Sequence, residues 1–236
     1  MERIRDWLAA ARSVVALTGA GISAESGIPT FRGTGGLWRQ YRAEDLATPE
    51  AFARDPKLVW EWYDWRRGVI ARAEPNAGHR ALAALQQRIP EFTLITQNVD
   101  GLHDRAGSRQ ILKLHGDIWA LRCTACGRER EDHRAPLPDL PPRCDCGAIE
   151  RPGVVWFGEH LRDDVWSSAL GAAKGSDVFL VIGTSAVVHP AANLIGWAKW
   201  GLAKVIEINL EETPATAVAH VSLRRAAAEA LPELVA

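Results

Sequence analysis

The sequence lacks a long apolar run: no stretch approaches the roughly 18 apolar residues that a membrane-spanning helix needs. It also lacks an excess of either charge, since 28 Lys and Arg residues stand against 29 Asp and Glu residues and leave a net charge of −1. This balance excludes the basic footprint typical of nucleic-acid and anionic-membrane binding. The segment from Met1 to Asp6 carries acids and leads into a helix predicted over 2–12, which is not the pattern of a signal peptide. We therefore expect a cytoplasmic protein with no membrane or nucleic-acid partner.

Cysteine is scarce, and the four cysteines that occur are clustered at Cys123, Cys126, Cys144 and Cys146. This clustering favours a metal site in a reducing compartment over disulfides. Two close pairs suit a tetrahedral four-cysteine zinc site, which is structural because it has no open position for water. Free or redox-active cysteines remain an alternative. A nucleic-acid-binding zinc ribbon is disfavoured by the acids in the same segment.

Predicted strands and helices alternate along most of the 236 residues. Strands are expected at 14–17, 92–96, 110–114, 177–182 and 204–208, and helices at 2–12, 56–73, 76–88, 162–174 and 189–201. A further helix is expected to begin at Thr48-Pro49, with Thr48 as its N-cap. This alternation predicts an α/β fold built on a doubly wound parallel sheet.

The composition shifts in two places, which divides the chain. Residues 117–152 hold all four cysteines and five prolines, and we expect an inserted zinc module there. Residues 33–48 are rich in glycine and then polar, which suggests a lid within a helical lobe over about 33–75. The Rossmann-like core would then comprise about 1–32, 76–116 and 153–236, and the run at 154–159 would return to it.

A glycine-rich turn follows the first predicted strand. Gly19, Ala20, Gly21 and Ala24 form a G-x-G-x-x-A pattern, in which backbone can approach a phosphate without a Cβ in the way. Phe31 and Arg32 then add an aromatic ring and a fixed cation beside the same turn. A plain strand–helix turn is the alternative for the glycines alone.

The acid that a standard dinucleotide fold places about 20 residues after its glycine turn has no clear counterpart. Glu44 and Asp45 are near that distance, but no second strand leads into them. Asn209, at the end of a later strand, is a better ribose contact. The pattern therefore predicts a phosphate site but not a standard dehydrogenase half.

Polar groups follow the other predicted strands, where ligands of open α/β sheets bind. His115 ends one strand, and its imidazole could take a proton from a sugar hydroxyl at neutral pH. A structural histidine is the alternative. His79 and His189 fall beside helix starts, where capping is more natural, while His103 shares a loop with Asp100 and stays open as a competing base.

Taken together, the motifs GAGISAESGIPTFRG, TQNVDGLH, LHG, VVWFGE, GTSAVVHPA and INLE, with the paired cysteines, resemble those of the sirtuins, the NAD-dependent protein-lysine deacylases. The resemblance runs from Val14 to Glu211. It implies a Rossmann-like domain with an inserted zinc module and a helical lobe, and a cleft for NAD and an acyl-lysine peptide. It also implies attack of the acyl oxygen on the ribose, release of nicotinamide, and transfer of the acyl group to give 2′-O-acyl-ADP-ribose.

The resemblance also implies roles for individual residues. His115 would be the general base, with Asn98 beside it in the catalytic site. The NAD-binding residues would be Gly19, Ala20, Gly21, Ala24, Phe31, Arg32, Gln97, Asn98, Asp100, Gly183, Thr184, Ser185, Asn209, Leu210, Glu211 and Ala227. The peptide would pair as a strand between Gly158-Glu159 and the segment 186–188, with Val154 and Val187 also in contact with it. We expect a monomer.

Tyr63 and Arg66 lie three residues apart on a predicted helix and so share a face. They resemble the tyrosine–arginine motif of the sirtuin branch that removes acidic acyl groups, in which phenol and guanidinium hold the carboxylate of succinyl- or malonyl-lysine. Ala47 is small and would leave room for the longer acyl chain. A packed tyrosine and a solvated arginine are the alternative, and deacetylation is expected alongside.

Two other functions stay open from the sequence. A mono-ADP-ribosyltransferase would use the same cleavage of NAD with a protein as acceptor. A non-catalytic module would bind NAD and zinc without turnover. His115 and the Tyr63/Arg66 pair favour the deacylase.

Overall fold

Six parallel strands form the central sheet of the computed structural model, which describes residues 1–31 and 42–235. Their spatial order is β3-β2-β1-β7-β8-β9. The strands are β1 (Ser13–Thr18), β2 (Glu91–Thr96), β3 (Ile111–Lys113), β7 (Val178–Ile182), β8 (Lys204–Ile208) and β9 (Val221–Leu223). The order reverses direction between β1 and β7, which places a ligand crevice at their carboxyl ends. The prediction of a doubly wound parallel sheet is confirmed.

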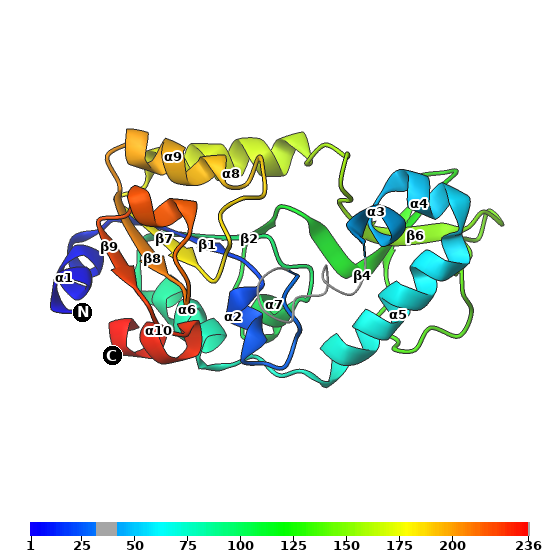
Figure 1. Cartoon of the computed structure of the whole chain (residues 1–236), viewed down its shortest axis with the longest axis horizontal. Helices are drawn as coiled ribbons and strands as arrows, with labels where there is room; N and C mark the ends of the chain where they lie inside the picture. The colour runs from blue at the N-terminus through cyan, green and yellow to red at the C-terminus, as the bar shows by residue number, and fades with distance from the viewer. Residues whose placement is uncertain (32–41, 236) are drawn as a thin grey trace.

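Helices cover both faces of this sheet (Figure 1). Val14 and Ala16 of β1 face one layer, which contains α1 (Glu2–Ala10), α6 (Ala77–Arg88) and α10 (Ala227–Val235). Val15 and Leu17 face the other, which contains α8 (Asp163–Gly175) and α9 (Asn193–Trp200). Successive side chains of a strand point to opposite faces, so an unbroken apolar run is what a strand covered on both sides requires.

Side-chain caps set where the helices around α5 begin. The Thr48 hydroxyl accepts from the Ala51 N–H at 3.1 Å and starts α4 (Pro49–Arg54), which confirms the predicted N-cap. The Asp55 carboxylate accepts from the Leu58 N–H at 2.9 Å and starts α5 (Pro56–Arg72). Asn76 starts α6 in the same way. The short helix α3 (Ala43–Leu46) precedes α4.

A second, antiparallel sheet lies beside α5, in the order β5-β4-β6. Its strands are β4 (Gly116–Cys123), β5 (Glu129–Glu131) and β6 (Glu150–Val154). Figure 1 shows β4 and β6 grouped with α3, α4 and α5, apart from α1, α9 and α10. The expectation that 154–159 returns to the parallel core is not met, because Val154 ends β6 and Trp156 packs in the same cluster as α5.

The short elements differ most from expectation. The predicted helix over 189–201 begins only at Asn193, whose side-chain oxygen lies 2.8 Å from His189 Nδ1. β9 was not anticipated, because it has three residues and is held by pairing with β8. The nine-residue helix α10 was not anticipated either. The single-turn helices α2 (Gly21–Ala24) and α7 (Leu102–Arg105) and the 3₁₀ helix Pro214–Ala217 complete the fold. Within the described ranges, no helix combines the length and apolarity needed to cross a membrane.

Candidate functional site

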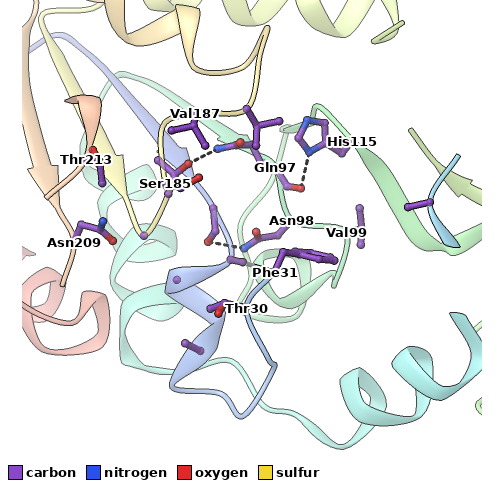
Figure 2. Close-up of a pocket in the computed structure, with 18 of the residues that line it drawn as sticks. Thr30, Phe31, Gln97, Asn98, Val99, His115, Ser185, Val187, Asn209 and Thr213 are labelled. Atoms are coloured by element: carbon purple, nitrogen blue, oxygen red, sulfur yellow. Dashed lines mark hydrogen bonds between the residues drawn. The ribbon is translucent and has the colours of Figure 1, made fainter. Parts of the chain in front are cut away.

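A cavity of about 740 Å³ opens at the carboxyl ends of the central strands. One wall is made of the loops after β1, β2, β7 and β8, and the other of α5 and the segment that follows β6. Asn209 and Thr213 lie at one end of it, and Phe31 and His115 lie toward the other (Figure 2). The volume suits a ligand larger than a single sugar or base.

The structure brings almost all of the predicted site residues to this cavity. Its lining contains Gly19, Ala20, Gly21, Ala24, Phe31, Ala47, Tyr63, Arg66, Gln97, Asn98, His115, Val154, Gly158, Glu159, Gly183, Thr184, Ser185, Val187, Asn209, Leu210, Glu211 and Ala227. Asp100 instead lines a small adjoining cavity together with Ser23 and Arg66. Arg32 and most of the predicted lid lie outside the described residues.

The glycines of the first turn are required by the neighbouring turn after β7. A Cβ on Gly21 would come within 2.7 Å of the Gly183 Cα, and one on Gly19 within 2.8 Å of the Thr184 Cβ. The Gly21 N–H donates to the Gly183 carbonyl at 2.7 Å. The two turns therefore pack closely against each other, and their glycines add no side chains to this part of the cavity floor.

Two amides after β2 tie this floor to the rest of the site. The Gln97 amide donates to the Thr184 hydroxyl at 2.9 Å, and the Asn98 amide donates to the Gly19 carbonyl at 3.0 Å (Figure 2). These bonds fix three strand-end loops relative to one another. They hold the site in place before a ligand arrives, which reduces the ordering cost of binding.

His115 has a defined tautomer. Its Nδ1 lies 3.1 Å from the Gln97 carbonyl oxygen, which can only accept, so Nδ1 carries the proton (Figure 2). Nε2 is then the unprotonated nitrogen, and no described residue bonds to it. Burial lowers the pKa of His115 below 6.5, although the bond to Gln97 opposes this. The imidazole is therefore neutral at pH 7 and can accept a proton.

His103 is not a second base. It is buried and absent from the cavity lining, its Nε2 lies 3.0 Å from the Thr18 hydroxyl, and its ring lies 4.8 Å from that of His79. Burial, with His79 and Lys113, lowers the pKa of His103 to about 3. His79 closes the cap of α6 through a bond from the Asn76 N–H. The competing base that the sequence left open is thus part of a neutral packed layer beneath the site.

Asp100 is held beside this layer by two donors. Its carboxylate accepts from the Ser23 hydroxyl at 2.8 Å and from the Leu102 N–H at 2.9 Å. Burial raises its pKa, and these two bonds oppose the rise. Sequence reasoning missed Ser23, although it belongs to the glycine-rich motif, because its side chain reaches Asp100 only in the folded chain.

Tyr63 and Arg66 form part of the wall opposite the glycine turn. They are 5% and 4% exposed, so the solvated arginine considered as an alternative is excluded. Burial raises the pKa of Tyr63 to about 12, and burial lowers that of Arg66 to about 10, which leaves a neutral phenol and a cation at pH 7.

Among the described residues, the guanidinium of Arg66 has aromatic neighbours but no anionic one in hydrogen-bonding range. It lies 4.4 Å above the Phe31 ring and 5.3 Å above the Trp62 ring. Within the part of the chain that the structure describes, no group accepts a hydrogen bond or forms an ion pair with it. A buried cation in this state favours an anionic partner from outside the chain. Ala47 also lines this wall, and its carbonyl accepts from the Phe157 N–H at 3.0 Å.

The four cysteines meet outside the cavity. Their sulfur atoms all lie within 4.8 Å of one another, with Cys123 and Cys146 at 3.5 Å and Cys126 and Cys144 at 3.8 Å. Four thiolates around a tetrahedral zinc ion at about 2.3 Å lie about 3.8 Å apart. Backbone N–H groups of Cys126 and Ala125 point at the Cys123 sulfur and lower its pKa to about 6. The cluster therefore fits a structural zinc ion.

The chain is similar to a known protein family and to individual members that share one description. Residues 19–190 match the model of the Sir2 family. The chain is 56% identical over 223 residues to an NAD-dependent protein deacylase of Aquifex aeolicus, covering 94% of this chain and 93% of the relative. It is 53% identical over 233 residues to NAD-dependent protein deacylase 2 of Pyrobaculum aerophilum, covering 98% and 93%.

Solved structures agree with these relatives. A mutant Sir2 homologue in complex with ADP-ribose superposes with a TM-score of 0.97 at 50% identity, covering 100% of this chain and 95% of that one. A Sir2 homologue in complex with NAD superposes with a TM-score of 0.94 at 51% identity, covering 100% and 92%.

Proposed function

The chain belongs to the Sir2 family, and we propose that it is an NAD-dependent protein-lysine deacylase with a preference for acidic acyl groups. It would remove succinyl, malonyl and acetyl groups from lysine and release nicotinamide and 2′-O-acyl-ADP-ribose. The observation that carries the proposal is the Arg66 guanidinium in the wall of the cavity that also contains His115, a cation for which no described residue provides a hydrogen-bond acceptor or an ion pair.

NAD as cosubstrate supplies a glycosidic bond to nicotinamide, whose cleavage drives removal of the acyl group. The glycine turn would accept the pyrophosphate, and Asn209 and Glu211 would bind the adenosine part. Gln97 and Asn98, fixed by their bonds to neighbouring loops, would hold the nicotinamide ribose. Phe31 would shield the reacting ribose carbon, since a water-excluded site strengthens electrostatic stabilisation and prevents hydrolysis.

His115 would act through Nε2. Because Nδ1–H donates to the Gln97 carbonyl, Nε2 can take a proton from a ribose hydroxyl as that hydroxyl attacks the acyl group. The lowered pKa keeps this nitrogen unprotonated at neutral pH.

The acyl preference follows from charge. A carboxylate can accept from a guanidinium and a phenol at once, and such charge-assisted bonds are about twice as strong as neutral ones. An acetyl group has no carboxylate and would leave Arg66 as it is now. The peptide itself would pair as a strand between Gly158-Glu159 and the segment 186–188, both of which contribute to the cavity lining.

The four cysteines would hold one structural zinc ion. The segment between β4 and β6 has few apolar residues of its own, so the ion would supply folding energy to it.

One assay tests the proposal against its alternatives. The protein is incubated with NAD and a succinyl-lysine peptide, and deacylated peptide, nicotinamide and acyl-ADP-ribose are quantified by mass. We expect the three products in equal amounts. Protein that carries ADP-ribose, without deacylated peptide, would instead indicate a mono-ADP-ribosyltransferase. The absence of nicotinamide release would indicate a non-catalytic module.

A further inference from the structure

The hydroxyl of Tyr63 is the starting point. Its oxygen accepts a hydrogen bond from the Trp156 indole N–H at 2.9 Å, and both side chains are buried. A phenol both donates and accepts, whereas an indole N–H only donates. The Tyr63 oxygen therefore already accepts its hydrogen bond from Trp156, and the phenolic proton needs a different partner, which must be an acceptor. Within the described residues, no acceptor for that proton is found.

Arg66 lies close to this hydroxyl. It is one helical turn from Tyr63 on α5, and each residue shifts the pKa of the other. A guanidinium carries only donors. If the Tyr63 oxygen were free, Arg66 could donate to it, and the pair would satisfy part of its own hydrogen-bonding capacity. With the indole in place, both side chains present donors to the cavity.

Trp156 is itself held firmly. The guanidinium carbon of Arg151 lies 3.5 Å from the centroid of the indole ring, and the Phe52 ring packs at 5.2 Å. Arg151 is fixed in turn by a two-pronged ion pair with Glu159, at 2.5 and 2.9 Å, and Glu159 also accepts from the Trp156 backbone N–H at 2.8 Å. A cation over the ring withdraws electron density from the indole and makes its N–H a stronger donor.

We propose that Trp156 is a specificity-determining positioning residue, whose indole N–H turns the Tyr63 hydroxyl so that its proton is donated to an acidic acyl group in the cavity. The inference rests on the proposed function and adds a residue to it. It assigns Arg151 and Glu159 to the support of the indole. Glu159 then acts through its side chain as a brace for Trp156, besides any backbone contact with the peptide.

The test uses W156F, Y63F and the double variant Y63F/W156F. Phenylalanine keeps an aromatic ring against Arg151 and Phe52 but removes the N–H. KM and kcat are measured at saturating NAD with succinyl-lysine and acetyl-lysine forms of one peptide. We expect W156F to raise the succinyl KM about 5-fold, the worth of one hydrogen bond, and the acetyl KM by less. The double variant Y63F/W156F should have the same succinyl KM as Y63F.

Two results would overturn the inference: an equal effect of W156F on both peptides, or a further rise of the succinyl KM when W156F is added to Y63F. Melting curves establish that the variants fold. If W156F alone does not, the double variant, which leaves neither polar partner orphaned, still overturns the inference if its succinyl KM lies above that of Y63F.

Failure of the proposed function gives a different pattern from failure of this inference. A wild-type protein without preference for succinyl-lysine would refute the function. A preference that R66M abolishes and W156F leaves intact would refute only the role of Trp156.

Discussion

Replacing Arg66 with methionine should convert an acidic-acyl deacylase into a deacetylase. Methionine keeps an apolar side chain beside Phe31 and Trp62, but it removes the guanidinium that lies over both rings. Loss of one partner of a desolvated charge pair costs about 2–5 kcal/mol, and 3 kcal/mol is about 150-fold in kcat/KM. An acetyl group loses only the support that the guanidinium gives Phe31, about 1 kcal/mol or 5-fold. The ratio of succinyl to acetyl kcat/KM should therefore fall about 30-fold.

The same substitution should not destabilise the fold. Arg66 is a buried cation for which no described residue provides an ion pair, so an apolar side chain of similar size removes a desolvation cost. We expect an unchanged or raised Tm.

The assay compares kcat/KM for the two peptides in the wild type, in R66M and in R72M. Arg72 is an exposed cation at the end of the same helix, and its loss should change neither activity. Equal losses of both activities in R66M would show that Arg66 does not bind the acyl carboxylate, and a lower Tm would show that its charge stabilises the fold.

Three further predictions concern the base, the metal and the adenosine side of the cavity. The acid limb of kcat/KM should lie below pH 6.5, because burial lowers the pKa of His115 and only its unprotonated form is active; a limb above 6.5 in a pH–rate profile would contradict this. C144S should lose the zinc ion and more than about 10 °C of Tm, whereas T124S at the neighbouring loop keeps both, as metal analysis and melting curves will show. E207Q should lose about 2 kcal/mol of unfolding free energy at pH 7, measured in urea, and raise the KM for NAD.

The Glu207 prediction has a defined pH dependence. The carboxylate is buried and accepts from Thr213, Thr216, Ser222 and Arg224, and of these Thr213 lines the cavity. Burial alone would raise its pKa, but these donors outweigh burial, and the pKa lies below 4.5. A lowered carboxyl pKa stabilises the fold above the unfolded value, and this stability is lost as pH falls through the folded value. Wild type and E207Q should thus converge in stability at acid pH; a constant difference would contradict the assignment.

The sheet and most of the cavity could be predicted from the sequence. Strands covered on both faces are continuous apolar runs such as Val14–Leu17, and the residues that follow them meet at one edge whatever the packing details. The glycine turn, Gln97, His115 and Asn209 could therefore be placed together without coordinates. The short strand β9 could not be predicted, because three residues are too few to show an alternating apolar pattern and the strand depends on pairing with β8.

The wall opposite the glycine turn was harder to predict. A spacing of three puts Tyr63 and Arg66 on one face of a helix, but it does not say whether that face is buried. Burial comes from packing of α5 against β4 and β6. The bond between Tyr63 and Trp156 joins residues 93 positions apart and depends on where β6 ends. No local pattern in the sequence encodes that distance.

The choice among histidines also required the fold. His103 and His115 both follow strands and both carry an imidazole near polar groups. Only the structure shows that His103 faces the packed layer and that His115 faces the cavity with a carbonyl on Nδ1.

The binding of an acidic acyl group by Arg66 is measured by the ratio of kcat/KM for succinyl-lysine to that for acetyl-lysine, with the unmodified protein, NAD and one peptide sequence. Charge-assisted bonds from Arg66 and Tyr63 predict a ratio of about 10 or more. A ratio at or below one, with nicotinamide released from NAD in both reactions, would contradict this binding: the cavity would cleave NAD, but the guanidinium in its wall would not bind the acyl carboxylate.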